Sequence, residues 1–449
     1  ATGVKVGEPV FISGHPGATA RQETLAQMAF ARDHSIPFNL KSWRRRREAL
    51  LRYGATSAEA RRTVQDQVYG LENNLKRWEG FLRTLRDADN WTRLEKQEAE
   101  LKAAVAKQGG RTAMAAWDAI AQAVDREKGM MKPRALVGTL GSQTLAYALL
   151  LVQAQAERAK PNDQRLPEFS EARLKSTEGR LFNPKPIEVG VDQALMLNAL
   201  QEAQEVLPNH PFTKAVLKGR TPEQVVASAF AHTRILDVAE RKRVWEQGEG
   251  AAQDEMLALA RAIDPLVREL RKQYEDEVDS IFKEQGGRLA QSRFTLYGHE
   301  AYPDATFTLR LSYGKVAGYP ANGTWQAPFT TFAGLYDRAW GMGPEAEGGA
   351  WKLPPRWTEA WKKLDLTTPY NFAYSADTIG GNSGSPVVNA QGQVVGLNFD
   401  GNQEKLGNRY VYDPRTMRAV AVDARAILEA LTKVFDAPHL VQELKGAKP

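Results

Sequence analysis

The spacing of apolar residues changes near Arg293, and this change constrains the fold of the 449-residue chain more than any other feature. Before it, apolar residues recur at spacings of three and four, which is typical of helices that bury one face. After it, apolar and polar residues alternate, as they do along strands with one buried face. The chain therefore predicts a long helical region followed by a β region, in the α+β class.

The helical region is predicted to contain two long helices and several shorter ones. A seam with alternating steps of four and three predicts the first helix, and the second runs from Ala251 to Phe282, where Pro265 should kink or restart it. Residues 113–124 and 195–206 are shorter helical segments. Such seams indicate helix packing on helix. The seam consists of Val64, Val68, Leu71, Leu75, Trp78, Leu82 and Leu85.

Strand patterns lie at both ends of the chain. Near the N-terminus they cover Val4–Val6 and Val10–Ile12. Beyond the helical region, the strict alternation from Thr306 to Tyr313 predicts a strand with one buried face. Two further strands are expected at 385–389 and 393–399, and a helix at 422–435.

Three parts follow from these patterns. We expect a strand segment of the β unit at residues 1–20, an α-helical domain at 21–290, and a β domain with a C-terminal helix at 291–449. The sequence begins without an initiator methionine or a signal pattern and enters strand-like sequence at once. We therefore expect it to be part of a longer polypeptide.

Composition excludes several classes of site. The formal charge of +6 is small for a surface of this size, and the basic run Lys41–Glu48 reads as a solvated helical face because no nucleic-acid motif accompanies it. The longest apolar run, at 145–152, is far shorter than the roughly 20 residues that cross a bilayer. The absence of cysteine excludes disulfides and Cys-ligated metals. We expect no nucleic-acid partner and no membrane span.

A glycine-rich segment in the β region has the pattern of a serine nucleophile loop. Attack on an amide needs a serine oxygen exposed on a tight turn, with backbone N–H groups aimed at the developing oxyanion. In Gly380–Val388, Ser383 is the expected nucleophile, and the N–H groups of Gly381 and Ser383 are the expected oxyanion donors. The strand at 393–401 would pair with the substrate backbone. A plain hairpin connection is the alternative, but the longer pattern through Gly401 favours a catalytic serine.

The partner residues of such a serine are not found in the sequence. In the chymotrypsin chain order, histidine and aspartate both precede the serine. None of the upstream histidines follows a strand in the expected way, and we interpret each as structural. The general base and its carboxylate are therefore expected outside this chain, which by itself should be nearly inactive. The upstream histidines are His15, His34, His210, His232 and His299.

Three strings together resemble the bacterial dipeptidyl peptidase family of serine exopeptidases, which includes dipeptidyl peptidases seven and eleven and dipeptidyl aminopeptidase BII. They are Gly14–Gly17, Tyr302–Arg310 and Asp377–Pro386. The resemblance implies a chymotrypsin-like double barrel with a large helical cap inserted in it, of which this chain holds the second barrel, with the nucleophile, and the cap. It also implies oligopeptide substrates cut after the second residue, a homodimer, a periplasmic or cell-envelope location, and no metal or cofactor.

The resemblance also assigns roles to residues around the serine. Asp400, with Asn73 or its neighbour Asn74 on the cap, would bind the substrate's α-ammonium, and Asn398 and Phe399 belong to the substrate-pairing strand. Gly401 matches the position where acidic-specific members carry arginine, which implies an apolar P1 preference.

A second interpretation of the pocket remains open. Asp377 lies six residues before Ser383, where trypsin-like enzymes place the carboxylate that binds P1 lysine or arginine, although a structural role is also compatible with it.

Two other functions remain open. One is an endopeptidase of the glutamyl-specific or heat-shock type, which shares the Gly-Asn-Ser-Gly string but lacks an inserted helical domain of this size. The other is a non-catalytic helical binding module with a vestigial serine loop.

Overall fold

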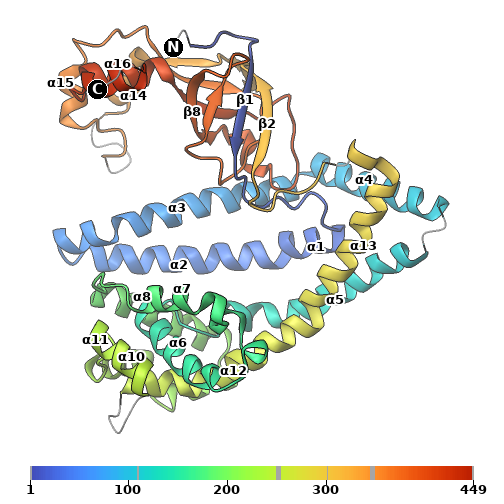
Figure 1. Cartoon of the computed structure of the whole chain (residues 1–449), viewed down its shortest axis with the longest axis vertical. Coiled ribbons are helices and arrows are strands. Elements are labelled where there is room, and N and C mark those ends of the chain that lie inside the picture. The colour runs from blue at the N-terminus through green and yellow to red at the C-terminus, as the bar shows by residue number, and fades with distance from the viewer. Residues whose placement is uncertain (1–2, 109–110, 249–253, 301, 344–348, 447–449) are drawn as a thin grey trace. The chain divides into compact units, whose positions relative to one another are not determined.

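The computed structural model describes residues 3–108, 111–248, 254–300, 302–343 and 349–446 (Figure 1). Contacts divide the chain into two compact units, which are described separately. The sheet unit comprises residues 1–23, 79–93 and 299–449, and the helical unit comprises 24–78 and 94–298. Residues 79–93, which the sequence places within the helical domain, thus belong to the sheet unit.

The helical unit is built from amphipathic helices around a large apolar core. Phe169, Met196, Phe212 and Ile263 are almost fully buried in this core. Buried carboxylates fix the helix starts: Asp192 accepts hydrogen bonds from the N–H groups at the start of α6. The helices of this region are α1 (Leu25–Phe30), α2 (Ile36–Gly54), α3 (Ala58–Arg86), α4 (Ala88–Lys107), α5 (Arg111–Leu136), α6 (Gln143–Arg158), α7 (Glu171–Leu181), α8 (Val189–Val206), α9 (Pro211–Leu217), α10 (Pro222–Ala231), α11 (Val238–Gln247), α12 (Glu255–Tyr274) and α13 (Ser280–Tyr297).

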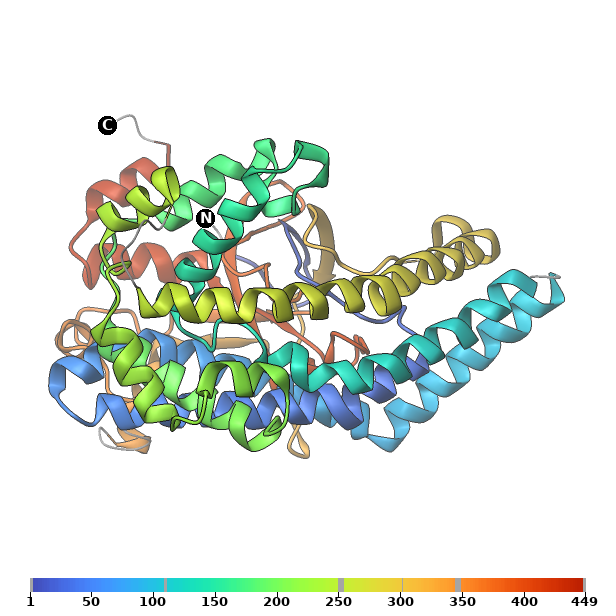
Figure 2. The ribbon, with the colours of Figure 1, turned by 90° about the horizontal axis from the view of Figure 1, so that it is seen from below.

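The predicted helices are confirmed, with one correction. The apolar seam lies within α3, and the two shorter segments lie within α5 and α8. Pro265 lies inside α12, which runs on to Tyr274, so the proline does not restart the helix. Asp264 beside it accepts hydrogen bonds from Gln153 and Arg268. The second helix instead changes at a π-helical turn, Glu275–Asp279, after which α13 continues the rod and packs along α5 (Figure 2). Its predicted start at Ala251 lies outside the described residues.

The sheet unit contains a seven-stranded antiparallel sheet in the order β2-β1-β7-β8-β9-β6-β5. The edge strand β2 also approaches β6, since the N–H of Ser375, just after β6, donates to the carbonyl of Lys315 at 3.0 Å. The core lies on the face that holds Ile12, Phe372 and Val387. The strands are β1 (Pro9–Gly14), β2 (Arg310–Lys315), β5 (Phe329–Thr331), β6 (Pro369–Tyr374), β7 (Pro386–Val388), β8 (Val394–Gly401) and β9 (Ala419–Asp423), with β3 (Tyr319–Ala321) and β4 (Thr324–Gln326) as a separate hairpin and α14 (Phe332–Met342), α15 (Pro355–Ala360), α16 (Ala424–Lys433) and α17 (Pro438–Leu444) as helices.

Two strand predictions are wrong in part. Residues 4–6 form no strand, and β1 begins at Pro9. In β2 the alternation is real but its faces are reversed: Leu311 and Tyr313 are 67% and 76% exposed, while Ser312 is buried and donates to the carbonyl of Asp377. The core side of β2 is occupied by the polar chain segment that leads to Ser383, which leaves the apolar side chains outside.

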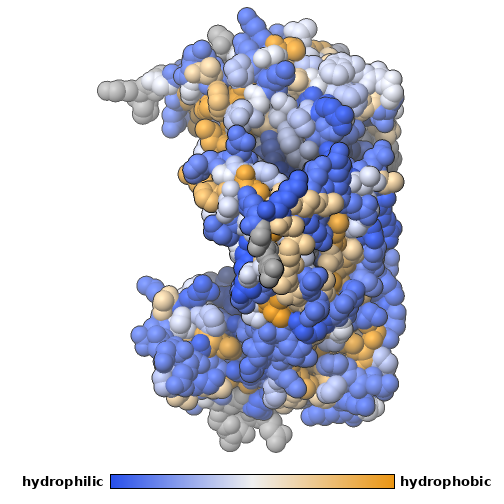
Figure 3. Space-filling model, turned by 90° about the vertical axis from the view of Figure 1, so that its right-hand side faces the viewer, coloured by the Kyte–Doolittle hydropathy of each residue, from blue (hydrophilic) through white to orange (hydrophobic). Residues whose placement is uncertain are grey.

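On the face drawn in Figure 3, hydrophilic residues predominate and apolar patches lie among them. Within the basic run on α2, Lys41 and Arg45 pair with Glu205, and Arg47 pairs with Glu72. These pairs agree with a solvated helical face. Across the described ranges, no helix combines the length and the apolar character needed to cross a bilayer.

Candidate active site

Ser383 lies on an exposed turn between β6 and β7. Gly381 and Gly384 adopt φ angles of +110° and +84°, a region that favours glycine. These two glycines reverse the chain on either side of Ser383 and leave its side chain in solvent. The Ser383 hydroxyl donates to the carbonyl of Phe399 at 3.2 Å. The chain therefore presents the hydroxyl at the end of β8, as the sequence predicts.

Buried polar side chains hold this turn from below. Asn382, only 1% exposed, accepts a hydrogen bond from the N–H of Ile379 at 3.1 Å. The side chain of Asn398 donates to the carbonyl of Asn382 and accepts from the hydroxyl of Tyr374 at 2.7 Å. Burial raises the pKa of Tyr374 and keeps its hydroxyl a donor. Asn398 thus supports the turn with its side chain, whereas the sequence assigns it to substrate binding.

Two backbone N–H groups of the turn are free to donate a hydrogen bond to a substrate. Within the part of the chain that the structure describes, the N–H groups of Gly381 and Ser383 donate no hydrogen bond, although the N–H groups of Asn382 and Gly384 donate to carbonyls. Donors at these two positions can stabilise an oxyanion on a carbonyl that Ser383 attacks.

The Gly14–Gly17 string supports the turn from the other side. The N–H of Gly17 donates to the carbonyl of Gly380 at 2.7 Å, and the carbonyl of His15 contacts Gly381 so closely that no side chain would fit there. Phe307 packs on the ring of His15 and is held at φ +62° by hydrogen bonds from its N–H to Pro16 and Gly17. No sequence pattern predicts this left-handed backbone at Phe307.

No general base is in place beside Ser383 among the described residues, where no histidine or carboxylate hydrogen-bonds to its hydroxyl. His15 is adjacent in the fold, but its backbone faces the turn while its ring packs on Phe307. His34, His210 and His232 belong to the helical unit. His299 lies in a 3₁₀ turn at residues 298–300.

The strand β8 forms the wall beyond the turn. Phe399 and Asp400 are exposed at its end, and the Asp400 carboxylate accepts a hydrogen bond from the N–H of Gly401 at 2.8 Å. Asn73 lies on α3 in the helical unit. Its predicted role with Asp400 stays a prediction.

Asp377 is engaged by an arginine. Arg21 holds both of its carboxylate oxygens, at 2.5 and 2.9 Å, and also donates to the carbonyl of Asn408. Both side chains of the pair are less than one-fifth exposed. This bidentate pairing favours the structural interpretation of Asp377 over a role in binding basic P1 side chains.

Lys405 is a buried cation that the sequence analysis did not single out. It lies in a 3₁₀ turn, Gln403–Gly407, and is 6% exposed, with its ammonium donating to the hydroxyl of Thr378. Burial lowers the pKa of Lys405 to about 7, against the opposing influence of Asp377 and Asp400. A lysine in a polar loop is normally solvated, so the sequence offers no signal for its burial. We call Arg21, Asp377, Thr378 and Lys405 the charged cluster.

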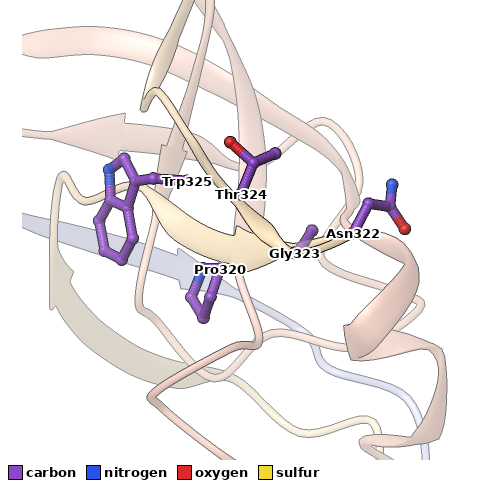
Figure 4. Close-up of a pocket in the computed structure, with 6 residues that line it drawn as sticks. Pro320, Asn322, Gly323, Thr324 and Trp325 are labelled. Carbon is purple, nitrogen blue, oxygen red and sulfur yellow. The ribbon is translucent and has the colours of Figure 1, made fainter.

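One surface hollow of the sheet unit lacks titratable side chains. A surface hollow follows the β3–β4 hairpin, where Pro320, Asn322, Thr324 and Trp325 line it without any titratable side chain (Figure 4). Among the residues with described positions, no three His, Cys, Asp or Glu side chains gather as metal ligands.

Comparison with known proteins decides the family. The peptidase S46 model matches residues 1–446. The chain belongs to the peptidase S46 family. This result agrees with the resemblance to dipeptidyl peptidases.

Named relatives add detail. The chain is 25% identical over 495 residues to an Asp/Glu-specific dipeptidyl-peptidase of Shewanella putrefaciens, covering 99% of this chain and 65% of the relative. Over 157 residues, 33% of this chain and 22% of the relative, it is 34% identical to dipeptidyl-peptidase 7 of Porphyromonas gingivalis.

The fold of this S46 chain also matches a solved structure. The crystal structure of Porphyromonas endodontalis DPP11 in complex with the dipeptide Arg-Glu gives a TM-score of 0.79 at 21% identity, covering 99% of this chain and 65% of that one. This likeness shows the fold, and in it the chain spans about two-thirds of the longer protein.

Proposed function

We propose that Ser383 is the nucleophile of a serine-type dipeptidyl peptidase that releases dipeptides from the free N-terminus of oligopeptides. The observation that carries this proposal is the exposed Ser383 hydroxyl beside the unpaired N–H groups of Gly381 and Ser383. The hydroxyl oxygen attacks the carbonyl carbon of the second residue while its proton passes to the general base, and the oxygen that becomes negative lies at these two donors. The peptide bond then breaks, the leaving amine takes up the proton, and water releases the dipeptide from Ser383. Membership of the S46 family and relatives with dipeptidyl-peptidase activity support it.

Cleavage after two residues requires a group that reads the free N-terminus. Asp400 is our candidate because it is an exposed carboxylate at the end of β8, beside the serine turn. Its anion would bind the substrate's α-ammonium, with Asn73 as a further predicted contact. This arrangement sets the distance from the ammonium to the cut and makes the enzyme an exopeptidase.

The general base forms a second part of the proposal. We place the histidine and its aspartate in a further barrel of the complete protein, so that residues 1–449 alone would be nearly inactive. The exposed Leu311 and Tyr313 on one face of β2 are compatible with this assignment, because contiguous apolar surface marks places where another part of a protein can pack. A chymotrypsin-like pair of barrels with the helical unit as a cap is the corresponding fold proposal. A homodimer and a periplasmic or cell-envelope location are also proposed, on family resemblance alone.

The P1 preference is not decided by Gly401. An apolar preference was expected because glycine leaves space, yet a Cβ on Gly401 would lie 2.7 Å from Cδ of Lys405, which occupies that space. One relative is named as Asp/Glu-specific, which favours acidic P1 residues as the proposal for this chain. The apolar preference therefore stays a prediction without structural support.

The test uses the full-length protein and an oligopeptide with either a free or an acetylated N-terminus. We expect mass spectrometry to show successive loss of dipeptides from the free peptide and almost no cleavage of the acetylated one. Equal cleavage of both would favour the endopeptidase alternative. No cleavage of either peptide, by a protein that is folded, would favour the non-catalytic binding module.

A further inference from the structure

In the proposed complex, the P1 side chain would enter beside the charged cluster. When the substrate carbonyl oxygen meets the N–H groups of Gly381 and Ser383 and the substrate backbone follows β8, the P1 side chain points between the segment before Ser383 and the end of β8. Lys405 bridges these two segments. Its Cδ lies 2.7 Å from a Cβ built on Gly401, and its ammonium donates to Thr378.

The charges around Lys405 do not balance once a substrate is bound. Arg21 neutralises Asp377 through two hydrogen bonds. In the proposed complex the substrate's α-ammonium forms an ion pair with the carboxylate of Asp400. Asp377 and Asp400 are the carboxylates whose charges act on Lys405, and once both are paired in this complex the cluster carries an excess positive charge. A buried cation of this kind favours an anion beside it.

We propose that Lys405 is a specificity-determining residue whose ammonium binds the carboxylate of a P1 aspartate or glutamate. The inference rests on the proposed dipeptidyl-peptidase function and names its substrate class. Lysine is suited to this role because its ammonium is a compact charge with three donors, of which Thr378 takes one and leaves two.

The turn that carries Lys405 is fixed by its surroundings. Gly407 lies so close to Thr84 that no larger residue fits there, and the side chain of Asn402 donates to the carbonyl of Thr416 at 2.7 Å. The side chain of Asn408 donates to the carbonyl of Thr378. The ammonium is therefore held in place before a substrate arrives, which is what selective binding requires.

The pH dependence follows from the groups that face Lys405. These are Asp377, Asp400 and Arg21, and the pKa of Lys405 is about 7. Below this pH the ammonium is charged and an acidic P1 side chain gains a partner. Above it the amine is neutral and that gain is lost. A bound P1 carboxylate raises the pKa, so the loss occurs at a pH somewhat higher than in the free enzyme.

The test compares matched substrates in the full-length enzyme. We expect kcat/KM for dipeptidyl fluorogenic peptides with P1 glutamate to exceed that for P1 glutamine by about 10- to 100-fold, the usual range for a hydrogen bond to a charged group. In Lys405→Met, which keeps the aliphatic stem, the Glu/Gln ratio should fall to about one. Lys405→Arg should keep the ratio and remove its fall between pH 6 and pH 9.

The ratio of kcat/KM for P1 glutamate to that for P1 glutamine tests the role of Lys405 independently of the proposed peptidase function. General-base titration affects both substrates alike, so it cancels in the ratio. An unchanged Glu/Gln ratio in Lys405→Met would overturn the role of Lys405 while leaving the peptidase proposal intact, and cleavage of no dipeptidyl substrate would overturn the latter. If Lys405→Met does not fold, Thr378→Val provides the second variant: it removes the partner of the ammonium, and an unchanged ratio there counts equally against the inference.

Discussion

The turn that carries Ser383 and the charged cluster beside it are built in opposite ways. The turn uses glycines and short polar side chains that lie close together in the sequence, and its orientation comes from Asn382 and Asn398. The charged cluster joins residues that are hundreds of positions apart, such as Arg21 and Asp377, through long charged side chains. The geometry of the turn therefore depends on a few local residues. The charged cluster depends on long-range pairs, so one substitution can change its charge and with it the substrate preference.

The largest effect is expected when the reacting oxygen of Ser383 is removed. Ser383→Ala in the full-length enzyme should lower kcat/KM by about 10⁶-fold, as in other serine triads. Steady-state kinetics measures the loss, and circular dichroism checks that the fold is kept. If the variant retained more than about 1% of the parent activity, another group would be the nucleophile, and the turn would not be the catalytic part of the site.

The ion pair of the charged cluster should matter for stability. Asp377→Ala leaves the guanidinium of Arg21 mostly buried without its carboxylate, and we expect the free energy of unfolding to fall by about 3–5 kcal/mol. Urea denaturation measures it. Glu59→Ala is the matched control, because its pair with Arg62 is well exposed to solvent and should contribute little to stability. Equal losses in both variants would contradict a buried, functional cluster.

A substitution at Asp400 tests whether binding of the substrate's N-terminus is separate from catalysis at the Ser383 turn. Asp400→Asn removes the charge that would pair with the α-ammonium, and kcat/KM for free dipeptidyl substrates should fall by the equivalent of about 2–5 kcal/mol. Rates on N-acetylated peptides, already poor, should not change. A parallel fall on both kinds of substrate would mean that Asp400 supports the turn and does not read the ammonium.

Tyr374 gives the smallest expected effect and tests the support beneath the turn. Tyr374→Phe leaves the buried Asn398 oxygen without a donor, which should cost about 1–3 kcal/mol of stability. Thermal or urea unfolding of the full-length protein measures it, with Tyr313→Phe on the exposed face of β2 as the control. A variant as stable as the control would show that the turn does not depend on this hydrogen bond.

The sequence predicted the parts of this molecule that depend on local patterns. The seam of α3 and the glycines around Ser383 are of this kind, because helix periodicity and turn geometry are set within a few residues. The faces of β2 were reversed because alternation tells which residues share a face and not which face is covered.

The charged cluster could not be predicted from the sequence, for a related reason. Burial of Lys405 depends on packing among segments distant in the sequence, and a lysine between polar neighbours has the pattern of a solvated residue. The partner of Asp377 could not be chosen either, because many arginines in the chain could have paired with it.

Active-site labelling tests the central claim, that Ser383 is an activated nucleophile, most directly. The full-length protein is treated with a fluorophosphonate probe, digested, and mapped by mass spectrometry, with Ser383→Ala as the control. We predict a single modified peptide that contains residues 380–386, with the adduct on Ser383 and no labelling of the variant. Labelling at a different serine, or no labelling of a folded protein that cleaves dipeptidyl substrates, would contradict the account.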